Sequence, residues 1–259
     1  MPRKCGWWRN NPVPKAIIFC DIDGCLNDGK HIGFDLDALA EVRQRIRALT
    51  DRGVILSLCT GRPQPYAEAM AQVLDLHTPF VCEYGAMVFD PETDEAISLL
   101  APDDRAEIAR LRQHLQTLVG DGNKHVLEPG KDFALSITGP GIVGAENAAI
   151  EAQMKAYQAK CDGFNVIWTY SISAIDIAPE GISKQTGAAY LLDRYGIDPS
   201  ATYAIGDSIG DIPVLFFAHH ALCPANAAPK VREICGFTAK HPTTRGVVEI
   251  LDHILSKLA

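Results

Sequence analysis

Short apolar runs alternate with amphipathic stretches along the first third of the chain. Residues 16–20 are entirely apolar and end at the charged Asp21, a pattern typical of a strand buried in a parallel sheet. Apolar residues then recur at three- and four-residue steps over 36–49, which predicts a helix that ends before Gly53. The pattern continues with a predicted strand, helix and strand at residues 54–58, 66–74 and 80–82.

The pattern changes after Gly85. Strand-like segments now come in groups, separated by fewer and longer amphipathic segments and by clusters of turn-forming residues. This grouping of strand-like segments predicts an antiparallel sheet with helices on one face. The predicted strands are residues 87–89, 133–138, 166–168 and 174–177, and the predicted helices are 105–119 and 146–160.

The first alternation returns from Ser183 onward. Strands are predicted at 202–205 and 221–223, and helices at 185–195, near 211–217, at 229–234 and at 247–258. We therefore expect an α/β fold, a doubly wound Rossmann-like parallel sheet with an inserted α+β cap domain. The expected core comprises residues 1–85 and 180–259, and the expected cap residues 86–179.

Composition narrows the function classes. The 259 residues are 47 % hydrophobic and 22 % charged, which is ordinary for a globular protein and excludes a disordered or fibrous chain. A net charge of −8 argues against nucleic acid as a partner. No apolar stretch approaches a membrane span, no secretory signal is evident, and the eight cysteines show no CxxC spacing. We expect a cytoplasmic monomer or homodimer without a membrane partner.

Polar residues follow the predicted strands of the core. Ligands of open α/β sheets bind beyond the carboxyl ends of the strands, so these residues should meet at one edge. Each motif alone has an ordinary structural explanation, such as a turn at Asp23-Gly24, but their conjunction indicates a site. The motifs are Asp21-Ile22-Asp23-Gly24, Thr60-Gly61-Arg62, Lys184, and Gly206-Asp207-Ser208 with Asp211.

This set of residues suits phosphoryl transfer. Crowded carboxylates repel one another unless a cation lies among them, and hard oxygen ligands favour Mg²⁺. A carboxylate can also attack phosphorus, while a second one transfers the proton to and from the reacting oxygens. A lysine, a hydroxyl and backbone N–H groups can neutralise the phosphoryl oxygens.

The same motifs resemble the four motifs of the haloacid dehalogenase superfamily of phosphatases, in the same order. The large insertion between the second and third motifs is similar to the Cof-type, sugar-phosphatase-like branch (subclass IIB). The resemblance extends over nearly everything from Lys15 onward. Further segments similar to that branch are Asp176-Ile177-Ala178-Pro179, Ala225-Asn226-Ala227 and Gly246-Val247.

The resemblance implies a Mg²⁺-dependent phosphatase that hydrolyses a small phosphorylated metabolite, such as a sugar phosphate, through an aspartyl-phosphate. Asp21 would be the nucleophile and Asp23 the general acid/base, a pair that argues against the dehalogenase members. Mg²⁺ would be held by Asp21, the Asp23 backbone carbonyl and Asp207, with support from Asp211. Phosphate would be bound by Thr60, Gly61, Arg62 and Lys184.

Three positions depart from the usual pattern of the family. Cys25 stands where threonine is commonest, which removes one hydrogen bond that would support the acid/base loop. Gly210 stands where many members of the branch carry asparagine, and Glu83-Tyr84-Gly85-Ala86 stands where Asn-Gly-Ala is frequent. None of these positions is a central carboxylate, so we expect activity to survive.

The expected cap would cover the site as a lid and select the substrate. We expect Glu128 and Lys131 to contact substrate. The other polar or aromatic candidates are His125, Asp132, Ser136, Trp168, Tyr170, Ser171 and Ser173.

Rival functions remain open from the sequence. A phosphomutase would use the same aspartates, and phosphoglycolate or a glycosyl-3-phosphoglycerate could replace a sugar phosphate as substrate. A catalytically silent metabolite-binding protein is disfavoured by the intact carboxylates and Lys184. Dinucleotide binding is disfavoured because no GxGxxG follows the first strand.

Overall fold

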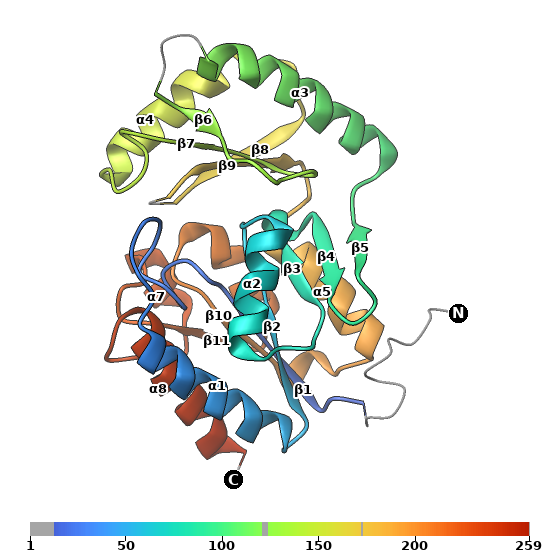
Figure 1. Cartoon of the computed structure of the whole chain (residues 1–259), viewed down its shortest axis with the longest axis vertical. Helices are drawn as coiled ribbons and strands as arrows, with labels where there is room; N and C mark the ends of the chain where they lie inside the picture. The colour runs from blue at the N-terminus through green and yellow to red at the C-terminus, as the bar shows by residue number, and fades with distance from the viewer. Residues whose placement is uncertain (1–12, 121–123, 172, 259) are drawn as a thin grey trace.

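The computed structural model describes residues 13–120, 124–171 and 173–258, and its elements alternate as the hydrophobic pattern indicates (Figure 1). Within these residues a central sheet has the strand order β12-β11-β10-β1-β2, and all of its neighbouring strands are parallel. The strands are β1 (Ala16–Cys20), β2 (Val54–Leu58), β10 (Thr202–Ile205), β11 (His220–Cys223) and β12 (Phe237–Thr238).

Helices cover both faces of the central sheet, because successive side chains of a strand point to opposite faces. Ile18 and Cys20 of β1 pack on one face with three helices, and Ile17 and Phe19 pack on the other face with three more. The first set is α1 (Leu36–Thr50), α2 (Gln64–Leu74) and α8 (Thr243–Lys257). The second is α5 (Lys184–Tyr195), α6 (Ile212–Phe217) and α7 (Pro229–Ile234).

A small antiparallel sheet continues the edge next to β2. It consists of β3 (Phe80–Cys82), β4 (Met87–Asp90) and β5 (Glu95–Ser98), and Cys59 and Val81 form a parallel bridge toward it. Val88 of β4 packs in the same hydrophobic cluster as Phe19, so this hairpin adheres to the central unit. Short 3₁₀ helices lie at η2 (Glu83–Gly85), η3 (Pro199–Ala201) and η4 (Ile209–Asp211).

A four-stranded antiparallel sheet stands above the carboxyl ends of the central strands (Figure 1). Its order is β6-β7-β9-β8, formed by β6 (Val126–Leu127), β7 (Leu135–Thr138), β8 (Val166–Tyr170) and β9 (Ile175–Pro179). Two helices, α3 (Pro102–Gly120) and α4 (Asn147–Gln158), pack on one face in a separate hydrophobic cluster. The other face is left to cover the edge of the central sheet.

The predicted fold class is confirmed, including an α+β cap on a doubly wound core. The domain boundaries at residues 85/86 and 179/180 stay a prediction, and β4, which follows residue 85, packs in the hydrophobic clusters of the core. The short strands β5, β6 and β12 were not predicted, because their two to four residues carry little periodicity. Helix α3 begins three residues before its predicted start, because Pro102, Asp103 and Asp104 start the helix before its apolar repeat begins.

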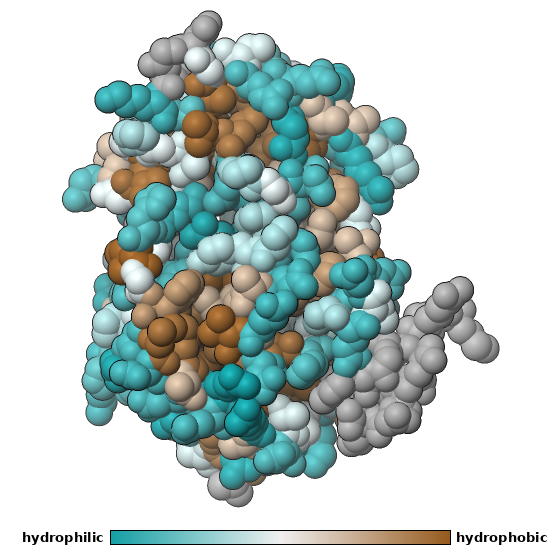
Figure 2. Space-filling view, viewed as in Figure 1, coloured by the Kyte–Doolittle hydropathy of each residue, from teal (hydrophilic) through white to brown (hydrophobic). Residues whose placement is uncertain are grey.

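Hydrophilic side chains predominate on the face seen in Figure 2, and hydrophobic ones gather in separate patches. Among the described residues, none of the helices combines the length and the apolar character that a membrane span requires.

Candidate active site

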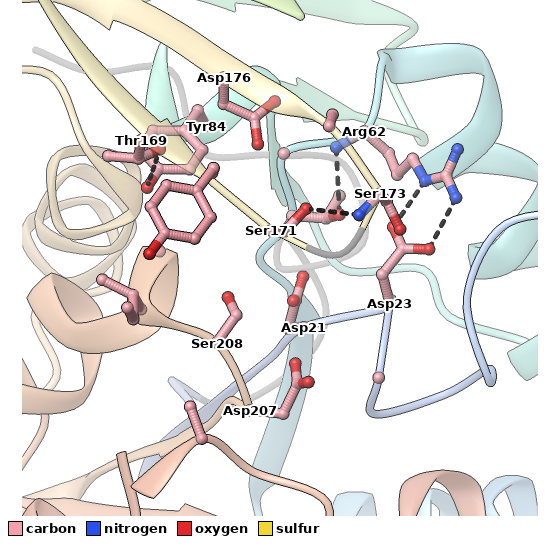
Figure 3. Close-up of a pocket in the computed structure, with 18 of the residues that line it drawn as sticks. Asp21, Asp23, Arg62, Tyr84, Thr169, Ser171, Ser173, Asp176, Asp207 and Ser208 are labelled. Carbon is pink, nitrogen blue, oxygen red and sulfur yellow. Dashed lines mark hydrogen bonds and ion pairs between the residues drawn. The ribbon is translucent and has the colours of Figure 1, made fainter. Parts of the chain in front are cut away.

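Three strand ends and one helix start converge beneath the four-stranded sheet. Asp21 follows β1, Thr60 follows β2 and Asp207 follows β10, while Lys184 begins α5. Asp21, Thr60 and Lys184 are 6 %, 1 % and 3 % exposed, so they form the floor of the site. Figure 3 shows the carboxylates of Asp21 and Asp207 facing the same opening. This convergence of side chains was expected from the positions of the motifs after the predicted strands.

Lys184 is the central cation of the floor. Its Nζ lies 2.7 Å from Oδ1 of Asp21 and 2.5 Å from Oδ1 of Asp211. A capping box of Ser183 and Thr186 fixes the first turn of α5. Burial opposes protonation, but the two carboxylates outweigh it and hold the pKa of Lys184 well above its usual value. Lys184 is therefore a fixed positive charge.

Asp211 organises the loop that carries Asp207. Its Oδ2 accepts the backbone N–H of Asp207 at 3.1 Å and both the N–H and the hydroxyl of Ser208 at 2.9 Å. Its Oδ1 is engaged by Lys184. With both oxygens occupied and the residue fully buried, Asp211 is suited to supporting a ligand site rather than to binding substrate.

Asp207 presents an oxygen that lacks a partner. Its Oδ2 is 3.4 Å from Nδ2 of Asn226, which also donates to the Gly24 carbonyl at 2.9 Å. Its Oδ1 is buried, and no hydrogen-bond donor in the described part of the chain reaches it. Gly24 permits this approach, since a Cβ there would lie 2.2 Å from the Asp207 carboxylate. Such an oxygen calls for a bound cation or donor.

The electrostatics of the floor point to the same need. Burial, followed by repulsion from Asp211, raises the pKa of Asp21 to about 7. Burial and the charges of Asp211 and Asp21 likewise raise the pKa of Asp207 well above its usual value. Three carboxylates face one lysine, so two negative charges are left uncompensated.

These residues fit a hard divalent cation. Oxygens of Asp21, Asp207 and Asp211 lie within 4.8 Å of one another, and this is a metal-capable group among the described residues. An all-oxygen set with an unpartnered carboxylate oxygen suits Mg²⁺. Asp21 and Asp207 are the available ligands, because the oxygens of Asp211 are already engaged.

Asp23 is held by Arg62 beside the floor. Arg62 donates from Nε to Oδ2 and from Nη2 to Oδ1, both at 2.6 Å, and Asn27 donates to Oδ1 at 3.3 Å. The Arg62 backbone N–H in turn donates to Oγ1 of Thr60 at 3.1 Å. The guanidinium stacks over the ring of Tyr66 at 4.4 Å. Arg62, which was expected to bind phosphate, thus contacts Asp23 directly.

The two expected cap residues lie in one ionic cluster. The Glu128 carboxylate forms ion pairs with Lys30 at 2.8 Å, Lys131 at 3.2 Å and Arg62 at 3.3 Å. Lys131, only 4 % exposed, also contacts Asp176 at 3.5 Å and donates to the Ser136 hydroxyl. Burial opposes ionisation of Glu128, but Lys131, Lys30 and Arg62 outweigh it and lower its pKa to about 2.

A cavity of about 380 Å³ joins the floor to the cap. Of the expected cap residues, Glu128, Lys131, Tyr170, Ser171 and Ser173 line it, as does Gly61 of the core. The remaining expected residues (His125, Asp132, Ser136 and Trp168) are not among its lining residues. His125 instead bonds the Tyr157 hydroxyl at 2.8 Å.

Several lining residues were not expected as site residues, among them Lys30, Tyr84, Thr169, Asp176 and Asn226. The sequence carried a signal for three of them. Asp176, Asn226 and Tyr84 lie in segments that were compared with the family pattern. Lys30 and Thr169 carry no signal of their own, because their place depends on how the cap docks.

Cys25 is fully buried behind the floor. Burial and then the Asp207 charge raise the pKa of its thiol well above the usual value, so it is an unreactive packing residue.

Comparison with known proteins agrees with this geometry. A family model described as haloacid dehalogenase-like hydrolase matches residues 18–128 and 127–251. A phosphoglycolate phosphatase of Aeropyrum pernix is 29 % identical, over 92 % of this chain and 93 % of its own. One of Methanopyrus kandleri is 25 % identical, over 94 % and 98 %.

Solved structures show the same fold. A haloacid dehalogenase-like hydrolase from Bacteroides thetaiotaomicron superposes with a TM-score of 0.67 at 17 % identity, covering 92 % of this chain and 99 % of its own.

Proposed function

The chain belongs to the haloacid dehalogenase-like hydrolase family and is a phosphoric monoester hydrolase, and from that premise we propose that it uses Mg²⁺ and an aspartyl-phosphate intermediate to dephosphorylate a small metabolite. The observation that carries the proposal is the pairing of buried Asp21 and Asp211 with Lys184, beside a half-buried Asp207 that has one unpartnered oxygen. That arrangement is costly unless a cation and an anionic group complete it.

Asp21 is the proposed nucleophile. Its carboxylate attacks phosphorus, a bond forms from the Asp21 oxygen to phosphorus, and the ester bond to the leaving oxygen breaks. Asp23 gives its proton to that oxygen. In the second step Asp23 takes a proton from water, the water oxygen bonds to phosphorus, and the bond to Asp21 breaks to release phosphate.

The surrounding residues hold these groups in place. Lys184 compensates charge on Asp21 and on the phosphoryl oxygens, while Thr60 and backbone N–H groups near Gly61 contact the same oxygens. Arg62 fixes the rotamer of Asp23 at the mouth of the site. Mg²⁺, held by Asp21, Asp207 and the Asp23 carbonyl with Asp211 in support, would neutralise negative charge there.

The cavity argues for a small, polyhydroxylated leaving group. About 380 Å³ lies at the small end of the range for ligand pockets. Its cap end carries three cations, Lys30, Arg62 and Lys131, and each is already paired with a carboxylate. Paired charges offer both donors and acceptors to hydroxyl groups, whereas a substrate carboxylate would need a cation of its own. We therefore favour a sugar phosphate.

Phosphoglycolate is the second candidate. The relatives from A. pernix and M. kandleri that match over nearly the whole chain are both phosphoglycolate phosphatases. A glycosyl-3-phosphoglycerate combines both features, since it carries a sugar and a carboxylate.

A panel of phosphate esters tests the proposal. Wild-type protein and Asp21→Asn are assayed with Mg²⁺ against sugar phosphates, phosphoglycolate and glycosyl-3-phosphoglycerate, with free phosphate as the readout. We expect release by wild type, highest with sugar phosphates, and none above background for Asp21→Asn. Equal rates for the two proteins would exclude Asp21 as nucleophile, and isomerised sugar phosphate without free phosphate would identify a phosphomutase.

A further inference from the structure

Tyr84 enters the site from an unusual stretch of backbone. It lies in η2, between β3 and β4, and Glu83 and Tyr84 have φ angles of 49° and 63°. The left-handed region is unfavourable for residues that carry a Cβ, so the surrounding structure must hold these two consecutive residues there.

Glu83 supplies that restraint. Its buried carboxylate accepts the backbone N–H groups of Asp132 at 2.9 Å, Phe133 at 2.6 Å and Ala134 at 3.0 Å, all in the cap. Burial raises the pKa of Glu83, and these three donors oppose the rise. The core loop is thereby tied to the cap immediately before Tyr84.

The side chain of Tyr84 forms a wall of the cavity. Figure 3 shows it on one side of Asp21, with the Arg62–Asp23 pair on the other. The residue is 5 % exposed and lines the cavity, and its hydroxyl accepts a hydrogen bond from Oγ1 of Thr169 on β8 at 3.0 Å. The ring therefore spans from the core to the cap face.

Gly210 leaves the space that this ring occupies. A Cβ at position 210 would lie 2.8 Å from Oη and 3.2 Å from Cε2 of Tyr84, closer than real Cβ contacts allow. Gly210 is absent from the left-handed residues, so its φ gives no reason for a glycine. The reason is space, and the departures from the family pattern at positions 84 and 210 are two halves of one packing arrangement.

We propose that Tyr84 is a specificity-determining residue that limits the size of the leaving group. Its ring closes the side of the cavity opposite Asp23. Its hydrogen bond to Thr169 fixes the position of β8 relative to the ring. A leaving group whose oxygen faces Asp23 must therefore fit between the two walls. The inference rests on the proposed phosphatase function and adds a size limit that the function alone does not contain.

Substrate series measure this limit. Wild type, Tyr84→Ala and Tyr84→Phe are assayed with glycerol phosphate, a hexose phosphate and a disaccharide phosphate, with kcat and KM determined separately. Tyr84→Ala should raise the preference for the disaccharide phosphate over the hexose phosphate by about tenfold or more, mainly through KM. Tyr84→Phe keeps the ring but loses the bond to Thr169, so its preference should lie much closer to wild type than to Tyr84→Ala. An unchanged preference in Tyr84→Ala would overturn the inference.

Gly210→Ala provides an independent arm, should Tyr84→Ala not fold. It pushes the ring into the cavity, so the preference should shift toward glycerol phosphate and the melting temperature should fall. In the double variant Tyr84→Ala/Gly210→Ala, the added methyl group should lower the melting temperature little, because the Tyr84 ring that it would clash with is absent. Equal losses of stability in both backgrounds would refute the packing argument.

The outcomes separate this inference from the proposed function. A wild-type protein that hydrolyses none of these esters or those of the wider panel defeats the function and the inference together. Hydrolysis with a size preference that ignores position 84 defeats the inference alone.

Discussion

Arg62 donates a hydrogen bond to each carboxylate oxygen of Asp23, with two donor–acceptor distances of 2.6 Å. This pair joins the loop after β1 to the loop after β2, and Glu128 of the cap lies 3.3 Å from the same guanidinium. Such two-point contacts fix orientation as well as charge. The side chain proposed to move protons is therefore positioned by a residue that also contacts the cap.

Loss of Arg62 should impair proton transfer more than attack on phosphorus. Arg62→Gln leaves Asp21 and Lys184 untouched but frees the Asp23 rotamer, so kcat for an alkyl phosphate should fall by about 10²-fold. An ester such as p-nitrophenyl phosphate has a leaving group that needs no proton, and its loss should be much smaller. Steady-state kinetics on both esters make the comparison.

A matched control lies on the far surface. Arg47 is 62 % exposed and pairs with Asp75, so Arg47→Gln should leave both rates unchanged. Equal losses with the two esters in Arg62→Gln would show that Arg62 binds phosphate instead of positioning Asp23.

Mg²⁺ should stabilise the protein through Asp207. At about 100 times its dissociation constant a ligand adds about 2.7 kcal/mol to the free energy of unfolding. Asp207→Asn should abolish this gain in a thermal-shift titration. Asp28→Asn, an exposed position on the cavity wall, should retain it. Full Mg²⁺ stabilisation of Asp207→Asn would place the ion elsewhere.

The Mg²⁺ effect should depend on pH. Burial and Asp211 raise the pKa of Asp21 to about 7, so protons compete with the ion below that value. Stabilisation by a fixed Mg²⁺ concentration should therefore grow from about pH 6 to about pH 8. A Mg²⁺ stabilisation that is independent of pH over this range would contradict the raised pKa of Asp21 or its role as a ligand.

Glu128 should also contribute stability that is lost in acid, but at a lower pH than the Mg²⁺ effect. Its pKa is lowered to about 2 in the folded protein, so its contribution is complete above the unfolded value of 4.5 and disappears as the pH falls toward 2. Glu128→Gln should lower the free energy of unfolding by about 2–3 kcal/mol at neutral pH, and the difference from wild type should shrink in acid.

Denaturant unfolding across that pH range measures the effect. Glu95→Gln, at an exposed position of β5, serves as the control and should follow wild type throughout. A Glu128→Gln deficit of the same size at every pH would show lost packing, with no contribution from ionisation.

The core of the site was predictable because its residues follow buried strands. Asp21, Thr60 and Asp207 each come after an apolar run, and parallel strands bring their carboxyl ends to one edge. The order of motifs and the large insertion also identified the family correctly, as the match over residues 18–251 shows.

The contacts between core and cap were not predictable, because they depend on how two separately folded surfaces meet. Lys30 reaches Glu128 across 98 positions of sequence, and Thr169 reaches Tyr84 across 85. Glu83 is a charged residue that sequence patterns place on the surface, yet it is fully buried because cap amides satisfy it. Gly210 became interpretable only with the Tyr84 ring in view.

Trapping the phosphorylated enzyme tests the central claim most directly. Wild type is mixed with Mg²⁺ and its best substrate, quenched in acid during the first turnover and digested, and mass spectrometry locates the phosphoryl group. We expect it on Asp21, formed and lost at rates that account for turnover, with none in Asp21→Asn. Free phosphate produced by wild type without a phosphorylated Asp21, or with the group on another residue, would contradict the proposed mechanism.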